Sequence, residues 1–287
     1  MLSKKKFLVV SMSSFVIFLF LGYALCQNGG KGLLDMFHKD VEQKELIPEH
    51  ISIEEEFSSP QGIAEVGVIE MVQGTAYIIH EEGNKAFLAK NKLPLYEGDQ
   101  LVTMEKSRIR AKLIDESAIA VSSYSKLDLA KVKYSKEDKT RENLLRMLKG
   151  KARFIVDKLP AGSKENFKVT TPTASIGIRG SDFAVMVVPE YEIEKNTGSK
   201  LLSWIYFADV AYAQPQTMVT LLLSGEQTQL AFSGMQGVMQ QVGPYSLSYA
   251  AAGAPAAVPT ALSAAAVNSA LQSIGPGLSV MSMPENF

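Results

Sequence analysis

The chain has 287 residues, of which 46% are hydrophobic and 21% are charged, as in a globular protein with one or two domains and a buried core. Its formal net charge of −1 gives no general reason to expect nucleic acid as a partner. The chain has a single cysteine, Cys26, which excludes a disulfide framework and a cysteine-based metal site.

The first 26 residues have the plan of an export signal. Three lysines at positions 4–6 precede an uncharged stretch at 7–26. This order is typical of a secretory signal, and about 20 apolar residues are also enough to span a bilayer once. We expect residues 1–26 to be a cleaved signal peptide or an inner-membrane anchor. Acylation of Cys26 is a third alternative, although Leu25 is bulky for such a site. Each alternative places the rest of the chain outside the cytoplasm.

Residues 27–61 are Gly-rich and then acidic, and they are predicted to form a flexible tether. From residue 62 to residue 188, short runs rich in Val, Ile, Tyr and Thr alternate with turn signals. Many strands of about four to seven residues predict an all-β fold, a sandwich or roll. The predicted strands are 66–72, 75–79, 86–88, 100–102, 108–113, 118–121, 126–130, 152–156, 167–170 and 182–188.

Basic and apolar side chains alternate over residues 108–113, which is typical of a strand with one face in water. Arg108, Arg110 and Lys112 would lie on that face, and we take them as candidate binding residues. Residues 140–148 are instead predicted to form a short, exposed helical insertion. Their leucines would share one helix face, and Gly150 follows at the position of a C-cap.

Residues 189–248 are predicted to be an extension that packs on the preceding domain, with an irregular loop followed by a β-hairpin. The loop contains an apolar segment, 201–207, around Trp204. This segment either packs back on the domain or forms an exposed contact patch. Residues 249–287 are rich in Ala, Pro, Ser and Gly, and they predict a low-complexity tail that is disordered or loosely helical.

The sequence contains no arrangement typical of catalysis. We interpret His80 as a solvated histidine at a strand end, because no further metal ligand lies at a fitting spacing. Asp115 with Glu116, and Glu97 with Asp99, could form acid and base pairs, but both pairs lie in predicted turns, where acidic residues are common. No serine or cysteine lies in a nucleophile motif. We therefore predict no enzyme, metal or cofactor.

Residues 171–185 read T-P-T-A-S-I-G-I-R-G-S-D-F-A-V. The glycines do not indicate a phosphate-binding loop, because a predicted strand beginning at Asp182 follows them rather than a helix. Pro172 restricts the backbone, whereas Gly177 and Gly180 permit a positive φ or a close approach. We predict a chain corner held by a buried Arg179. The alternative is that Arg179 recognises a ligand.

Five segments in order resemble the signatures of the FecR domain, from about residue 66 to residue 188. They are G-T-A-Y-I-I (74–79), L-Y-E-G-D-Q-L-V-T (95–103, with Gly98 and Asp99), R-A-K-L-I-D-E-S-A-I-A-V (110–121), L-K-G-K-A-R-F (148–154) and V-T-T-P-T-A-S-I-G-I-R-G-S-D-F-A-V (169–185). The family usually has Thr where this chain has Ser181. The resemblance implies a non-catalytic, extracytoplasmic all-β domain. Such domains occur in regulators that pass a signal from an outer-membrane receptor to a sigma factor, and in other exported proteins.

Together these features predict a non-enzymatic, exported FecR-domain protein. It would be periplasmic or attached to the inner membrane through residues 7–26, and it would bind a protein or envelope component rather than nucleic acid. The alternative is a component of a sigma-factor signalling system that acts through a separate membrane protein. We expect a separate protein because only six residues precede the apolar segment, too few to contact a sigma factor.

Overall fold

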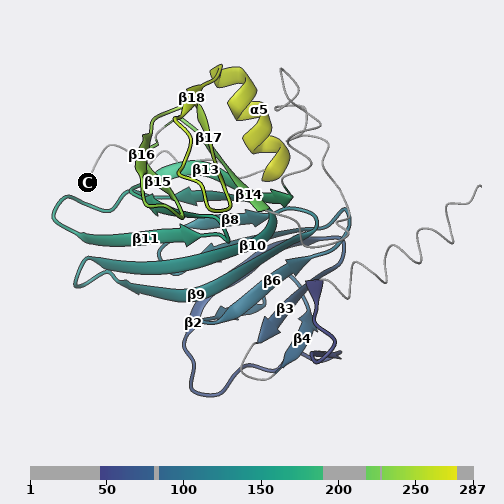
Figure 1. Ribbon diagram of the computed structural model, residues 1–287. Coiled ribbons are helices and arrows are strands. Elements are labelled where there is room, and N and C mark those ends of the chain that lie inside the picture. Colours follow the sequence, from purple (N-terminus) through teal and green to yellow (C-terminus); the bar gives the residue numbers. More distant parts are fainter. Residues whose placement is uncertain (1–45, 81–83, 190–217, 227, 277–287) are drawn as a thin grey trace, which may run out of the picture. The chain divides into compact units, whose positions relative to one another are not determined.

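The computed structural model describes residues 46–80, 84–189, 218–226 and 228–276. The predicted export segment, most of the tether and Trp204 lie outside these residues. The described chain consists mainly of β-strands, with one complete helix, α5 (Ala264–Ile274), near its end (Figure 1). The all-β prediction is confirmed. Within the described residues, no helix is both long and apolar enough to span a membrane.

The strands form two sheets, in which most neighbours are antiparallel. The first sheet has the order β1 (Ser52–Glu54), β4 (Lys85–Leu88), β3 (Ala76–His80), β6 (Asp99–Thr103), β9 (Ser125–Ser135), β10 (Thr140–Val156), β11 (Lys164–Thr170), β12 (Ala174–Ile178), β15 (Leu230–Gly234) and β16 (Met239–Val242). The second has the order β5 (Pro94–Tyr96), β2 (Glu65–Gln73), β7 (Arg108–Leu113), β8 (Ala118–Val121), β10, β13 (Ser181–Pro189), β14 (Met218–Ser224), β17 (Ser246–Ala251) and β18 (Thr260–Ala261).

Strand β10 belongs to both sheets. Residues 140–149 pair with β9 in the first sheet, and residues 150–156 pair with β13 in the second. The strand changes sheets at Gly150, where φ is +83° and an added Cβ would lie 2.5 Å from the carbonyl oxygen of Tyr124. Only glycine tolerates both conditions. Gly150 is therefore a point of sheet crossover, and its prediction as a helix C-cap was wrong.

The helical insertion predicted for residues 140–148 was also wrong, because these residues form the first half of β10. Their burial alternates with the period of a strand: Arg141, Asn143, Leu145 and Met147 are buried. Two of these four inward positions are polar, so the apolar pattern alone did not reveal the strand. Hydrogen bonding to β9 and β11 on either side outweighs the helix propensity of Leu, Glu and Arg.

The largest hydrophobic cluster takes side chains from both sheets, including Ile78 and Phe232 from the first and Phe154 and Phe183 from the second. The rings of Phe154 and Phe183 are stacked, with their centroids 5.1 Å apart. Burial of these apolar faces is the main source of stability in such a two-sheet fold. The motif at residues 171–185 runs from the turn before β12, through β12 in the first sheet, to the first residues of β13 in the second.

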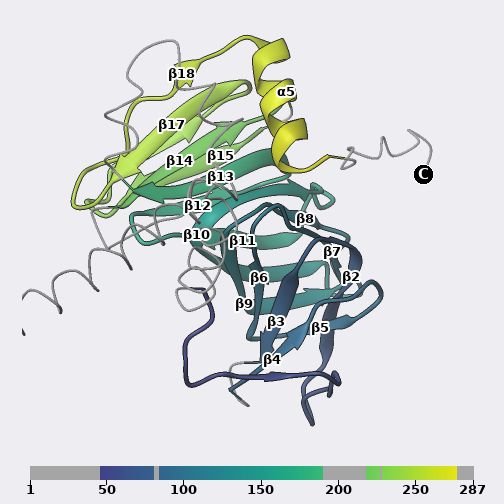
Figure 2. The same ribbon diagram turned by 90° about the vertical axis from the view of Figure 1, so that its right-hand side faces the viewer.

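Helix α5 covers part of the second sheet (Figure 2). Its buried residues are Val267, Ala270, Leu271 and Ile274, which pack against a cluster from β13 and β14. Ser263 caps its first turn by accepting a hydrogen bond from the backbone N–H of Ala266. The helical alternative for the C-terminal segment is thus correct in this part of the tail. The disordered alternative was wrong for residues 264–274, because apolar residues at helical spacing pack on the second sheet.

Candidate functional site

The turn between β12 and β13 forms a sharp corner that only glycine can make at residue 180. Gly180 has a φ of +66°, and an added Cβ would lie 2.6 Å from the Cβ of Lys158. Gly177 lies inside β12, where an added Cβ would find only an ordinary contact, 3.8 Å from the Cβ of Ala231. The predicted corner therefore depends on one of the two glycines.

The start of the motif, Thr171-Pro172-Thr173, makes the turn between β11 and β12. The hydroxyl of Thr220 on β14 lies 2.6 Å from that of Thr171 and 2.7 Å from that of Thr173. Thr173 also donates to the carbonyl oxygen of Ala250 at 3.0 Å. Pro172 itself is exposed. The two threonines thus attach this turn of the first sheet to strands of the second.

The side chain of Arg179 is exposed, so the prediction of a buried arginine at this position was wrong. Its backbone N–H donates to the carbonyl oxygen of Gln229 at 3.2 Å, which continues the pairing of β12 with β15. Residue 179 follows the end of β12, and its side chain leaves the sheet where the chain turns. Arg179 therefore contributes to the sheet through its backbone N–H, and its guanidinium lies at the surface.

The buried cation at this corner is Arg153 on β10, which is 3% exposed. It donates two hydrogen bonds to the Asp182 carboxylate, from Nε to Oδ1 at 2.9 Å and from Nη2 to Oδ2 at 2.7 Å. Its Nη1 donates to the carbonyl oxygen of Gly275 at 2.9 Å. Because α5 has no basic residue in its last turn, Arg153 supplies the positive charge that a helix C-terminus favours. Asp182 is therefore a structural residue that orients Arg153.

A pocket of about 440 Å³ opens beside the corner. Its walls come from residues 155–158 at the end of β10, from residues 179–182 of the motif, and from Glu226, Gln229 and Asn268. Within the described residues, neither Arg179 nor Lys158 makes a side-chain hydrogen bond or ion pair, and both are exposed. The pocket thus offers two cations that the fold does not use. A pocket of this size with a few converging polar groups is the usual form of a binding site.

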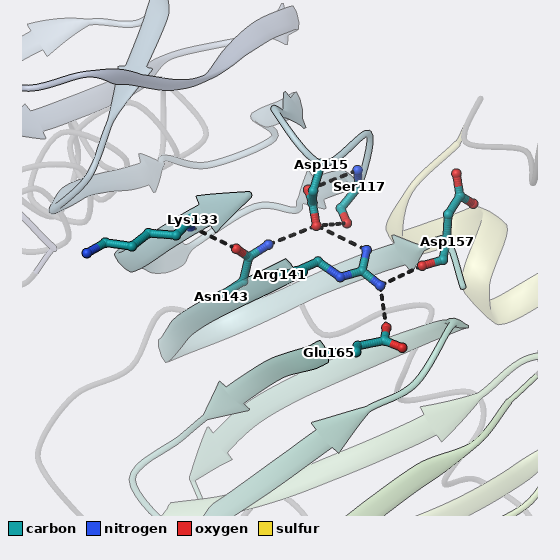
Figure 3. Close-up of polar contacts among 7 residues, drawn as sticks. All are labelled: Asp115, Ser117, Lys133, Arg141, Asn143, Asp157 and Glu165. Atoms are coloured by element: carbon teal, nitrogen blue, oxygen red, sulfur yellow. Dashed lines mark hydrogen bonds and ion pairs between the residues drawn. The ribbon is translucent and has the colours of Figure 1, made fainter. Parts of the chain in front are cut away.

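Asp157 connects this pocket to a buried polar cluster (Figure 3). The backbone oxygen of Asp157 accepts a hydrogen bond from Nη2 of Arg141 at 2.6 Å, and its carboxyl group points away from that arginine. Burial raises the pKa of the Asp157 carboxyl above its ordinary value of 3.8. Arg141 opposes this shift, and Asp115 adds to it.

Arg141 lies at the centre of the polar cluster and is 1% exposed. It pairs with the carboxylates of Asp115 and Glu165, and its guanidinium lies 5.7 Å from the ring centroid of Phe167. Asp115 also accepts hydrogen bonds from Nδ2 of Asn143 and from the hydroxyl of Ser117, both at 2.8 Å. The Asp-Glu-Ser turn between β7 and β8 is thus held by a strand from another part of the chain. Sequence reasoning treated Asp115 as an ordinary turn residue and missed its partners.

The predicted basic face on β7 exists, but its charges have partners. The guanidinium of Arg108 donates to the carbonyl oxygen of Ser273, in the last turn of α5, at 3.0 Å. Arg110 pairs with Glu70 at 3.0 Å, and Lys112 pairs with Glu116. The hydrogen bond to Glu116 raises the pKa of Lys112. Trp204, the remaining candidate, lies outside the described residues.

Gly98 and Asp99 form a second structural turn. Gly98 has a φ of +90°, and the Asp99 carboxylate accepts the backbone N–H of Tyr96 at 2.8 Å. The same carboxylate lies 2.5 Å from Nδ1 of His80, which is 7% exposed. His80 is packed among aromatic rings, so its prediction as a solvated residue was wrong. Pairing with Asp99 allows this polar ring to be buried.

Comparison with known protein families gives a match to the family described as FecR protein, over residues 99–201. This segment begins with Asp99 and contains Arg141, Arg153 and the corner at Gly180. The resemblance to the FecR family is therefore confirmed for this part of the chain. No curated protein matches the chain.

Two crystal structures of a "putative anti-sigma factor" from Parabacteroides distasonis ATCC 8503 are similar to this chain. Each is 15% identical over 60% of this chain and 64% of the other, with TM-scores of 0.40 and 0.39. The chain thus spans slightly less than two thirds of those proteins. A structure described as a "Cell surface anchoring domain" aligns with 23% of this chain and with 84% of its own length. The identity is 14% and the TM-score is 0.22.

Proposed function

We propose that this chain is a non-enzymatic, extracytoplasmic FecR-domain protein that binds a protein partner at the pocket beside Arg179. The observation that carries the proposal is that the fold needs some residues of the motif but not the side chain of Arg179. Gly180 makes the corner and Asp182 orients Arg153, whereas the Arg179 side chain has no partner within the described residues. A charged side chain at a pocket that the fold does not need is available for recognition.

The chemistry of the pocket favours a partner with an accessible carboxylate. Arg179 has a planar guanidinium that can donate a bidentate pair of hydrogen bonds to a carboxylate, and Lys158 adds a second positive charge. The Asp157 carboxyl, whose pKa is raised, is poorly compensated by its own surroundings and would gain from a donor on the partner. A protein segment with a carboxylate next to a hydrogen-bond donor meets both needs.

The proposed location is the periplasm, with the chain either released or attached to the inner membrane through residues 7–26. The basic start and the uncharged stretch that follows support export. Mass spectrometry of the N-terminus of the exported protein tests this proposal. A chain beginning near Gln27 means cleavage, an acylated Cys26 means lipid attachment, and an intact start means an anchor. Recovery of the full chain from the cytoplasm would contradict export.

Photo-crosslinking from the pocket tests the binding proposal. A crosslinking residue in place of the exposed Gln229 should capture the partner in living cells. The partner is then purified, and its affinity is measured for the unsubstituted protein, for Arg179→Ala and for Lys168→Ala, an exposed lysine on β11. We expect Arg179→Ala to weaken binding about tenfold or more, with an unchanged melting temperature. Equal effects of the two substitutions would contradict the proposal.

A second candidate function, a component of a sigma-factor signalling system, is favoured by the FecR match at residues 99–201. In this role the pocket would bind a separate membrane protein that transmits the signal. Deletion of the gene should then change transcription of a defined group of genes, and Arg179→Ala in the chromosome should reproduce that change. An unaltered transcriptome in the deletion strain would exclude this role.

A further inference from the structure

The last part of the chain has an uncharged surface. From Gln227 to Pro284 the sequence contains no Asp, Glu, Lys, Arg or His. Among the described residues, five of the nine exposed large hydrophobic side chains lie between 235 and 258. They are Met235 (67% exposed), Val238 (52%), Met239 (62%), Tyr249 (52%) and Val258 (76%). Exposed apolar side chains that gather in one part of a protein mark an interaction surface.

This surface includes a free sheet edge. Strand β16 pairs with β15 on one side, from Ser233 opposite Met239 to Leu230 opposite Val242. In the part of the chain that the structure describes, β16 pairs with no strand on its other side. Edge strands are usually protected by a lysine, a proline, a bulge or an inward-pointing charge. The sequence of β16, Met-Gln-Gln-Val, has none of the protective residues, and its pairing with β15 is regular.

We propose that β16 pairs in antiparallel orientation with β16 of a second copy of this chain, so that the first sheet continues across a two-fold axis. This inference goes beyond the proposed function, because the edge and the pocket are formed by different strands.

The composition of the edge favours a second copy as the occupant. In a two-fold pair both edges carry the same sequence, so a net charge on one edge would be repelled by the same net charge on the other. The edge has no charge to repel, and each glutamine amide can both donate to and accept from its counterpart. Met239 and Gln241 share one exposed face of β16, and an antiparallel neighbour would place its own side chains beside both.

The short edge limits the strength of this association. A four-residue strand forms only a few new backbone hydrogen bonds, and the exposed large apolar side chains on it and in the turn before it are Met235, Val238 and Met239. Such a contact falls in the small, transient class of interfaces. The dimer should therefore be populated in the micromolar range or above, in rapid exchange with the monomer.

Sedimentation equilibrium of the exported protein over a wide concentration range tests the proposal. The unsubstituted protein should show a monomer–dimer equilibrium. The double variant Met239→Lys/Gln241→Lys should weaken the dimer at least about tenfold, since two-fold pairing brings four lysines together. Gln272→Lys, on the exposed side of α5, is a control for an added charge in the same uncharged region and should leave the equilibrium unchanged.

Hydrogen exchange identifies the interface independently of the variants. Amides of residues 239–242 should become more protected as the protein concentration rises, while those of β7 should not change. A protein that is monomeric at every concentration overturns the proposal, and so does a dimer that the β16 variant leaves intact with no added protection at 239–242. The Arg179→Ala variant should dimerise normally. A result that contradicts dimerisation through β16 is therefore distinguishable from one that contradicts partner binding at the pocket.

Discussion

Arg141, Arg153 and Arg179 lie within one region of the fold but have different surroundings. Arg141 is buried among carboxylates, Arg153 joins Asp182 to the end of α5, and Arg179 is exposed at the pocket. Their burial depends on partners that are distant in the sequence: Asp115 and Glu165 lie 26 and 24 residues from Arg141. The local sequence therefore does not reveal which arginine is structural.

Replacement of Arg141 by alanine should strongly destabilise the protein. The change leaves Asp115 and Glu165 without their cation in a buried environment, and such uncompensated burial costs about 3–5 kcal/mol. Urea denaturation followed by circular dichroism would measure the loss. As a control, Lys131→Ala removes a pair with Glu142 at the surface, and it should cost less than about 1 kcal/mol. Similar costs for the two variants would show that the buried cluster contributes little.

Asp157→Asn should stabilise the protein at neutral pH. The pKa of Asp157 is raised in the folded state, mainly by burial. Between the ordinary value of 3.8 and the raised value, the folded chain keeps a proton that the unfolded chain has lost, so stability falls as the pH rises. Above the raised pKa this loss is complete. The hydrogen bond from Arg141 to the Asp157 backbone is retained in the variant.

The test is the free energy of unfolding of both proteins between about pH 3 and pH 8. The variant should gain stability relative to the unsubstituted protein as the pH rises, with the two most similar at the acidic end. A variant that is less stable at pH 7 would mean that the ionised carboxylate makes a favourable contact.

At the level of elements, the crossover of β10 depends on Gly150. Gly150→Ala should cost at least about 2 kcal/mol more than Gly62→Ala, because overpacking adds to backbone strain. Both glycines have a positive φ, +83° and +75°, but an added Cβ meets the Tyr124 carbonyl only at Gly150, and Gly62 has no neighbour within 4 Å. Thermal unfolding of the two variants gives the comparison. Equal losses would show that β10 shifts to accommodate a side chain.

Strands β7, β8 and β10 show where sequence patterns predict structure and where they do not. Strands 108–113 and 118–121 were predicted with their observed bounds, because apolar side chains face the core at every second position of the first. In residues 140–148 the inward positions include Arg141 and Asn143, whose burial depends on Asp115 in the turn between β7 and β8. The corner at Gly180 was predictable from its glycines, but the pocket was not, since its walls come from five stretches that are far apart in the sequence.

At the scale of the whole molecule, both sheets continue beyond the predicted end of the FecR domain at residue 188. Strand β14 pairs with β13 over seven residues, and β15 pairs with β12 over five. Helix α5 then covers the cluster that β13 and β14 share. The C-terminal strands are therefore part of the two sheets, although they lie outside the segments that carry the family motifs.

A chain that ends at residue 188 should not fold cooperatively, whereas residues 46–287 should. Truncation removes β14 and β15, so β13 and β12 each lose one strand neighbour, and Met186 and Ile176 lose part of their burial. Newly exposed apolar edges also favour aggregation. Soluble expression and thermal unfolding followed by circular dichroism compare the two chains. A cooperative transition of the shorter chain at the same temperature would show that residues 46–188 form an independent domain and that the later strands merely pack against it.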